Sequence, residues 1–446
     1  MLKSWVVASA VLSAFVSAGV VTDARAEDAR VLPAGRSRLT YDYAQTSTIS
    51  QQYDGGGNPI PISAPYNSIE LSSSRIASAQ AGAQVLINEL NTRWPELHYD
   101  SNQQNNGYGG IVKDPSSSLP RLGDALSRGF LGVGASATST QQNVSVMHGF
   151  TDRFSGGIFV PVKHFSVTVD HSFFGNNSAA AMYKFLKSYD AADFAGIQKG
   201  LNDVQNIDDR TLQGLLSQSG YNSFSDYDGS GIGDVVLGGR YMYYSERTRP
   251  GEWINSVQAG FTAPTGKLHD PANITEQDFG NGCWSLGLAH ISNFSPNSWL
   301  TFSNGTHFGY NLPATRQMRI RPAPDTIPDA SDQQDVGFHL GNDYSTNFGA
   351  DFKVTQAITL SSSYKFAWHS VDYYQGDRPV DYTYESDNTF TYLETLNLGA
   401  GISGLPAFLK GDLPAPIDAS LNFYLPTRGK NTIIAPYAVA EVAVYF

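Results

Sequence analysis

The sequence predicts an all-β protein, a transmembrane antiparallel β-barrel of about twelve strands with helices in its extracellular loops. Three observations lead to this prediction: an export signal at the start, repeated alternation of apolar and polar residues, and a final strand that ends on an aromatic residue. The 446-residue chain has 16% charged and 12% aromatic residues, a composition that suits sheets. After the export signal no apolar run is long enough for a membrane helix, so strands would have to cross the bilayer.

The first 26 residues have the parts of a signal peptide. Lys3 precedes an apolar stretch over residues 5–21, and Ala24-Arg25-Ala26 has the small residues at which signal peptidase cuts. We expect cleavage after Ala26 and a mature chain, residues 27–446, that forms one barrel. An uncleaved anchor is the alternative, but the apolar stretch is shorter than the roughly 20 residues that a span needs. Cys283 is the only cysteine, which excludes an internal disulfide and a thiolate metal cluster.

The last ten residues, YAVAEVAVYF, alternate as a strand does. Ala438, Val442 and Phe446 fall on one face, and Tyr437 and Glu441 fall on the other. A final strand that ends on a bare aromatic resembles the C-terminal signal by which outer-membrane barrels are recognised. We therefore expect the bacterial outer membrane as the location, outer-membrane lipid as the surroundings, and the barrel-insertion machinery as a partner that reads Phe446.

Connection lengths provide a second test of the barrel. We expect strands over residues 34–46, 130–150, 154–174, 231–246, 252–266, 281–293, 298–311, 335–353, 357–372, 387–402, 415–426 and 432–446. Long connections, above all the outer loops near 47–129 and 175–230, then mostly alternate with short ones, as extracellular loops and periplasmic turns do. Two connections depart from this rule: 403–414 is long for a periplasmic turn, and 427–431 is short for an outer loop.

Period-two alternation also predicts which residues face the lumen. In one strand Phe165, Val167 and Val169 alternate with His164 and Asp170, which predicts an apolar lipid face and a polar inner face. Mixed charges on the inner face could pair across strands or line a polar path. The lumen-lining candidates are Arg38, Asp42, Asp170, Arg240, Lys365, Asp418 and Glu441.

The long loop over residues 178–218 has a helical pattern. Its apolar residues recur at roughly helical spacing. They are Phe185, Ile197, Leu201, Val204, Leu212 and Leu215. Such helices need shelter for their apolar faces, so we weigh a lid or plug in the barrel mouth against simple external decoration.

The stretch SDYDGSGIGD at residues 225–234 resembles a calcium loop, with Asp226, Asp228 and Asp234 at ligand spacing. However, Leu237 stands where a bidentate Glu is needed, and a strand follows instead of a helix. The favoured interpretation is a turn that leads from a loop into a strand. The sequence has no nucleophile motif, zinc-protease spacing or dinucleotide fingerprint, so we expect no catalytic residue, metal site or cofactor. The formal charge of −12 argues against a nucleic-acid partner.

Four segments resemble an outer-membrane family that is associated with the meta-pathway of phenol degradation. They are VLPAGRSRLTYDY at 31–43, MHGFTDRFSGGIFVPV at 147–162, SGIGDVVLGGRYMYY at 230–244 and AGFTAPTGK at 259–267. The resemblance implies a barrel that passes small hydrophobic or aromatic molecules inward; a closed barrel that binds partners at the surface is the alternative. The family is distantly similar to long-chain fatty-acid transporters, which carry a plug before their first strand. Here the first strand is expected soon after the mature start, so any plug is expected from the outer loops.

Overall fold

The computed structural model describes residues 28–64, 69–79, 81–114, 118–322 and 328–446. The predicted signal peptide, residues 1–26, lies outside the described residues. The chain divides into two compact units. One, the helical unit, consists of residues 63–134 and 169–225, and the other, the barrel unit, contains the rest of the described chain.

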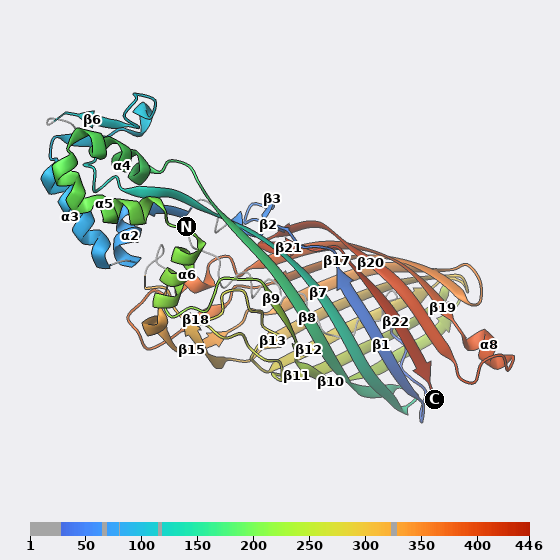
Figure 1. Ribbon diagram of the computed structural model, residues 1–446. Helices are drawn as coiled ribbons and strands as arrows, with labels where there is room; N and C mark the ends of the chain where they lie inside the picture. The colour runs from blue at the N-terminus through green and yellow to red at the C-terminus, as the bar shows by residue number, and fades with distance from the viewer. Residues whose placement is uncertain (1–27, 65–68, 80, 115–117, 323–327) are drawn as a thin grey trace. The chain divides into compact units, whose positions relative to one another are not determined.

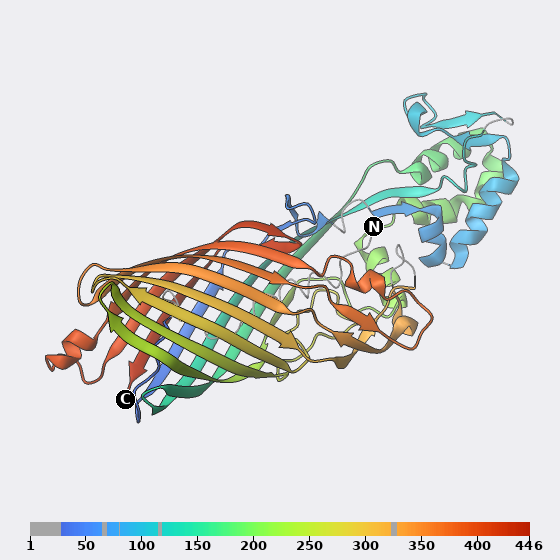
Figure 2. The same cartoon turned by 180° about the vertical axis from the view of Figure 1, so that it is seen from behind.

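Within the described residues, twelve strands form a closed antiparallel barrel (Figures 1 and 2). The β7–β8 pair and the β1–β22 pair complete the ring. The predicted fold class is therefore confirmed. The barrel strands are β1 (Ser37–Thr46), β7 (Ser127–Thr151), β8 (Phe154–Phe174), β10 (Val235–Thr248), β11 (Gly251–Ala263), β12 (Ser285–Ser295), β13 (Leu300–Asn311), β16 (Asp343–Lys353), β17 (Ile358–His369), β19 (Thr391–Ser403), β20 (Ile417–Lys430) and β22 (Tyr437–Tyr445).

Three expected segments differ from the observed strands for local reasons. Residues 335–353 divide into β15 (Gln333–His339) and β16, because the Gly341 N–H donates to the Asp372 side chain instead of to a neighbouring strand. Residues 432–446 divide at Pro436, which has no N–H to donate, into β21 (Thr432–Ile434) and β22. The end of the expected loop 175–230 forms β9 (Tyr227–Ile232), which pairs with β8.

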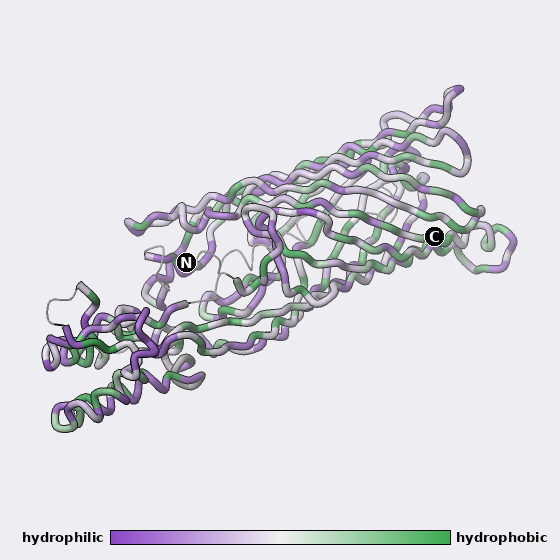
Figure 3. The backbone as a smooth tube through the Cα atoms, turned by 90° about the horizontal axis from the view of Figure 1, so that it is seen from above, coloured by the Kyte–Doolittle hydropathy of each residue, from purple (hydrophilic) through white to green (hydrophobic). Residues whose placement is uncertain are grey.

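The outer surface of the barrel has an apolar band between aromatic residues. Trp253 stacks on Phe294 near the short turns, and Phe261 stacks on Trp284 toward the other end. The eight-residue step from Trp253 to Phe261 on β11 rises ~27 Å along the strand. At a tilt of ~40° this is ~20 Å along the axis, close to the ~25 Å apolar band of outer-membrane barrels. Hydropathy alternates along these strands (Figure 3).

Strand β8 has the opposite orientation to the one predicted from its sequence. Phe165 and Val167 are buried, whereas Val162, one position out of phase with them, is exposed. Phe165 stacks on Phe279 of the β11–β12 connection, with ring centroids 5.7 Å apart. The apolar face of this strand is therefore used to hold a loop and not to meet lipid.

The long connections of the barrel unit carry small sheets of their own. β14 (Ala314–Arg319), β15 and β18 (Tyr373–Gln375) form one, beside α7 (Thr383–Ser386) and the 3-10 helix η3 (Ala330–Asp332). β2 (Gln51–Tyr53), β3 (Pro59–Pro61) and β21 form another. The β19–β20 connection contains α8 (Leu405–Leu409). None of the helices in the described parts of the chain is long and apolar enough to cross a membrane.

The helical unit buries its apolar faces internally. It contains β4 (Ile69–Ser72), α2 (Ser73–Ala79), α3 (Ala81–Arg93), β5 (Leu97–Tyr99), η2 (Ser101–Gln103), β6 (Ile111–Lys113), α4 (Ser178–Tyr189), α5 (Ala191–Gln205) and α6 (Asp209–Gln218). Ile197, Leu201 and Val204 of α5 belong to one core with Leu90 and Trp94. The helical pattern is thus confirmed, although the side chains of Leu212 and Leu215 are not among those described. The apolar faces of these helices are buried within the helical unit itself.

Shortening a core side chain should therefore loosen the helical unit alone. Leu201 is fully buried in its core, so Leu201→Ala should cost about 2–5 kcal/mol there. Hydrogen exchange should accelerate in α3, α4 and α5 while barrel amides stay protected. Lys199→Ala, on an exposed position of the same helix, is the control. Equal acceleration in the barrel strands would contradict separate cores.

Candidate solute pocket in the barrel lumen

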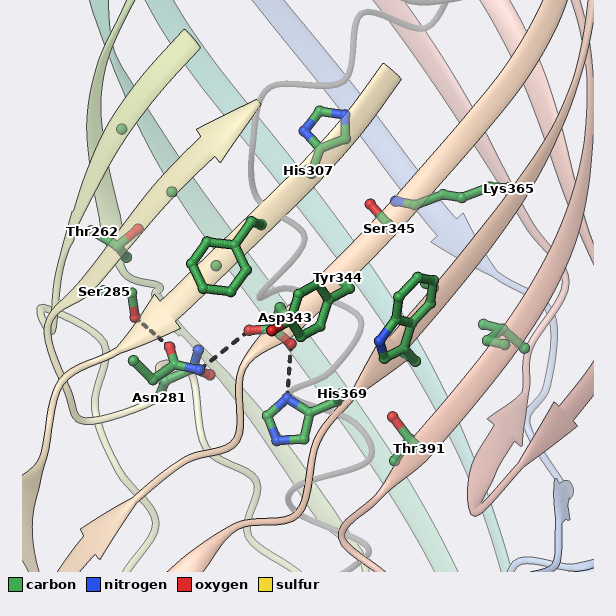
Figure 4. Close-up of a pocket in the computed structure, with 18 of the residues that line it drawn as sticks. Thr262, Asn281, Ser285, His307, Asp343, Tyr344, Ser345, Lys365, His369 and Thr391 are labelled. Carbon is green, nitrogen blue, oxygen red and sulfur yellow. Dashed lines mark hydrogen bonds and ion pairs between the residues drawn. The ribbon is translucent and has the colours of Figure 1, made fainter. Parts of the chain in front are cut away.

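The barrel lumen contains a pocket of about 190 Å³ (Figure 4). Its lining comes from strands β8, β10, β11, β12, β13, β16, β17, β19, β20, β21 and β22. Asp234 and Asn281, on connections at the long-loop end, complete one side. The pocket is therefore a feature of the ring as a whole, because residues up to about 280 positions apart in the chain meet there.

One row of the inner wall has no side chains. Gly157, Gly238, Gly260, Gly287 and Gly309 are successive register partners on β8, β10, β11, β12 and β13. Their chain neighbours Leu237 and Leu286 are exposed on the outer face, so these glycines face inward. A Cβ added at Gly260 would meet only ordinary contacts, at 3.7 and 3.8 Å. Packing does not require glycine there, and its effect is to leave space beside the pocket.

Apolar and aromatic side chains line the far side of the pocket. Ala367 and Leu393 are register partners on β17 and β19. Tyr424 of β20 and Tyr437 of β22 stack with ring centroids 4.4 Å apart and planes at 3°. Since β20 is half the strand order away from β11, an aromatic wall faces the glycine row across the ring.

A charged cluster occupies the rim of the pocket at the long-loop end. His369 Nδ1 lies 2.8 Å from Asp343 Oδ1, and His369 Nε2 lies 2.8 Å from Asp372 Oδ1. Both ring nitrogens face carboxylates, so both donate, and the ring is an imidazolium. Asn311 Nδ2 donates to Asp343, and Tyr374 Oη donates to Asp372 at 3.3 Å. Figure 4 shows Asp343 and His369 side by side at this rim. With one cation and two carboxylates, the cluster carries a net negative charge.

The connection over residues 264–284 is fastened to the barrel by buried polar groups. Asp234 accepts hydrogen bonds from the Gly266 and Asn281 N–H groups at 2.9 and 2.6 Å. The buried Lys163 Nζ donates to the Phe279 carbonyl at 2.6 Å. These bonds hold the connection against the strands that line the pocket.

Two buried carboxylates order the same connection from within. Asp278 accepts hydrogen bonds from His269 Nδ1 at 2.7 Å and from Arg316 Nη1 at 3.4 Å. Burial raises the pKa of Asp278, but the His269 hydrogen bonds and the Arg316 charge outweigh it and hold the pKa below its usual value. Burial also raises the pKa of Glu276, but hydrogen bonds from Lys267 and Asn273 outweigh the effect of burial and lower the pKa below its usual value. Both groups therefore stabilise the connection when ionised.

Acid should loosen this connection before it unfolds the barrel. A carboxylate whose pKa is lower in the folded state stabilises that state at pH values above its pKa in the unfolded chain, which is near 4. This stabilisation is lost as the pH falls through the pKa of the folded state. Asp278→Asn should reproduce the loss at neutral pH by leaving the largely buried Arg316 unpaired, at a cost of about 3–5 kcal/mol. Hydrogen exchange over residues 266–281 measures the effect. Asp270→Asn, at an exposed position, should change little; unchanged exchange in the Asp278 variant would refute the role of the pair.

The residues just before β1 lie inside the lumen, near the short turns. Ala29 is fully buried against Ile254 and Ile291, and its N–H donates to Asn293 Oδ1. Arg240 donates to the carbonyls of Asp28 and Arg30. A plug was expected only from the outer loops; instead, the segment before the first strand occupies this end. The inward arginine on β10 was the one sequence signal that could have indicated a partner there.

The predicted lumen-lining residues lie in different places. Lys365 lines the pocket. Arg240 is buried and also contacts Gln258 Oε1, at 2.9 Å. Asp170 is exposed and belongs to the helical unit. The four others lie on the adjoining strands β1, β20 and β22; they are Arg38, Asp42, Asp418 and Glu441. Asp42 is the register partner of Glu441, and Tyr445 Oη donates to Asp418.

The calcium-like aspartates do not form one loop. Asp228 lies on β9, where its carboxylate is 3.4 Å from His164, and Asp234 turns toward Gly266 and Asn281. Among the described residues, no three His, Cys, Asp or Glu side chains are placed to hold a metal ion together. The segment forms a strand and a turn, which agrees with the interpretation of the sequence as a turn that leads into a strand.

A closed antiparallel barrel with an apolar outer band between aromatic residues and a lumen that contains polar groups is the transmembrane fold of the bacterial outer membrane. The chain is thus an outer-membrane β-barrel. No protein-family model matches it, and no curated protein matches it in sequence.

Several solved structures resemble this chain at low sequence identity. An outer membrane channel from Pseudomonas putida F1 is 10% identical, with a TM-score of 0.50 over 94% of this chain and 98% of that one. The toluene transporter TbuX of Ralstonia pickettii is 10% identical, with a TM-score of 0.33 over 96% and 97%. A FadL homologue of Pseudomonas aeruginosa is 10% identical, with a TM-score of 0.30 over 92% and 90%. The first likeness shows that this chain has the fold of that channel.

Proposed function

We propose that the protein is a passive outer-membrane channel for small hydrophobic or aromatic molecules. The observation that carries the proposal is the lumen pocket, in which a wall without side chains faces Leu393, Tyr424 and Tyr437. A flat apolar solute can lie against backbone on one side and stack on tyrosine on the other. The solved structure that shares the fold is described as an outer membrane channel, which supports this assignment.

The same proposal includes the surroundings of the barrel and its route into the membrane. The apolar outer band would contact outer-membrane lipid, and Phe446 would be read by the barrel-insertion machinery. Phe446 is 63% exposed although its N–H donates to the Ser37 carbonyl at 3.0 Å. The aromatic side chain of Phe446 is thus accessible to a partner, while its backbone is hydrogen-bonded to the first strand of the barrel. We propose a channel that works without catalysis or a cofactor.

Two measurements on refolded mature protein test the channel. Planar-bilayer recordings report ion steps if the lumen is filled with water. Vesicles that contain the protein are then compared with empty vesicles for uptake of toluene, phenol and a sugar of similar mass. Relative to empty vesicles, the protein is expected to speed entry of the aromatic solutes by a larger factor than entry of the sugar. Equal rates in the presence and absence of inserted protein, for all three solutes, would refute a channel.

A closed barrel that binds partners at the surface is the second candidate. The helical unit favours it, because that unit has its own core and exposes Tyr108, at 60%, and Tyr189, at 40%. In this case solute uptake would be absent, and removal of residues 63–134 and 169–225 would abolish binding of the cell-surface partner.

A further inference from the structure

The β19–β20 connection, residues 404–416, is longer than a periplasmic turn needs to be, and it contains the five-residue helix α8. Figure 1 shows α8 at the end of the barrel where the C-terminus lies. That end also carries the short turns, which makes it the periplasmic end. Neither the pocket nor the proposed channel uses this helix.

The helix presents an apolar face that the protein leaves uncovered. Leu405, Phe408 and Leu409 are 47%, 37% and 74% exposed. Positions i, i+3 and i+4 lie on one side of a helix, so the three side chains form a single patch. An exposed cluster of this kind in a short helix marks an interaction surface.

The patch is continuous with the lipid-facing surface of the barrel. Ile402, near the end of β19, is 59% exposed, and its register partner Ile358 on β17 is 41% exposed. The Ser403 N–H donates to Ala357 and the Gly404 N–H donates to Ile417, at 2.7 Å each, so the helix begins where the wall ends. Its five residues span only about 7.5 Å. The headgroup layer of one leaflet is about 5–7 Å deep, so the patch stays within reach of lipid.

We propose that α8 is an interfacial foot of the barrel, whose Leu405, Phe408 and Leu409 side chains insert into the periplasmic leaflet between phospholipids. Lys410 follows at the edge of the patch, where an ammonium can meet lipid phosphates. Gly411, at a φ of +82°, then turns the chain back toward β20. The continuity with Ile402 and Ile358 favours lipid over a protein partner.

The depth of a fluorescent label tests this proposal on the full mature chain in phospholipid vesicles. Phe408→Cys and Leu409→Cys provide two labelling sites, and Asp412→Cys is the matched control on the polar side of the connection. Cys283 is 1% exposed, and burial raises the pKa of its thiol to about 11, so the native cysteine stays unlabelled. Labels at 408 and 409 should emit at shorter wavelength and be quenched several-fold more by nitroxide lipids than the label at 412.

Two results would overturn the proposal. Labels at 408 and 409 could be as accessible to aqueous iodide as the label at 412. They could become protected only when a periplasmic extract is added, which would indicate a protein partner. Because the measurement is one of depth, it does not depend on solute passage, and a failed channel assay would leave it intact.

Discussion

Replacing Gly260 with phenylalanine should lower uptake of aromatic solutes by about tenfold or more while the barrel still folds. Gly260 faces the lumen in the row without side chains, and a Cβ there meets only ordinary contacts. The new ring must therefore project into a pocket of about 190 Å³, where it would occupy the space opposite Tyr424. The ring cannot point outward, because on this strand the neighbouring residues Ala259 and Phe261 face the outside of the barrel.

The adjacent residue provides the control. Ala259→Phe puts the same ring on the exposed, lipid-facing side of the same strand and should leave uptake unchanged. Gly260→Ala should have a small effect, because a methyl group takes up little of the pocket. Heat-modifiable mobility on gels confirms that each variant is a folded barrel. Normal uptake by a folded Gly260→Phe barrel would place the solute path elsewhere.

The strands were predictable from sequence because alternation is a local property. Each strand of the ring overlaps an expected segment, and apolar residues that alternate with polar ones in the sequence, such as Leu237, Tyr241, Leu421 and Phe423, are exposed on the outer face. Strand β8 departs from it because Phe165 and Val167 pack inside, where Phe279 covers Phe165. An apolar face in a sequence does not say whether lipid or a loop will meet it.

The pocket was not predictable because it depends on register, which a single sequence does not encode locally. Asp343, His369 and Asp372 meet only because β16 and β17 pair with no offset and the chain then turns back over their ends. The glycine row is equally hidden, since its members look like ordinary small residues until five strands are aligned. Charge and period-two alternation together selected Lys365 and Arg240, but they also selected the exposed Asp170.

At each end of the lumen, buried charged groups hold a segment in place. At the long-loop end, Asp234 and Lys163 are bonded to the connection that borders the pocket, so this side is fixed by buried charge. At the periplasmic end, residues 28–30 are held by hydrogen bonds from the buried Arg240 to two backbone carbonyls, by the Ala29 N–H bond to Asn293, and by one exposed ion pair, Arg30–Glu252 at 3.3 Å. An exposed pair contributes about 0–1 kcal/mol, so Arg240 is the main charged group that holds this segment.

Replacing Arg240 with alanine should therefore raise single-channel conductance several-fold. The guanidinium donates to the carbonyls of Asp28 and Arg30 and to Gln258. Each hydrogen bond to a charged group is worth about 1.5–3 kcal/mol, so its loss shifts the segment toward the released state by a factor of about ten or more. With cleavage after Ala26, only a few residues would remain to be displaced from the lumen.

A charge lost from the lumen could itself alter conductance, and a double-mutant cycle separates the two causes. Removing residues 27–30 should raise conductance as Arg240→Ala does. If Arg240 acts by holding the segment, Arg240→Ala should add nothing in the shortened chain. If it acts through its charge, the two effects should add. Arg249→Ala, which removes the same charge from an exposed position beside the turn, should leave conductance unchanged. Additive effects would assign Arg240 to the ion path, and an unchanged conductance in both single variants would show that residues 28–30 do not obstruct the lumen.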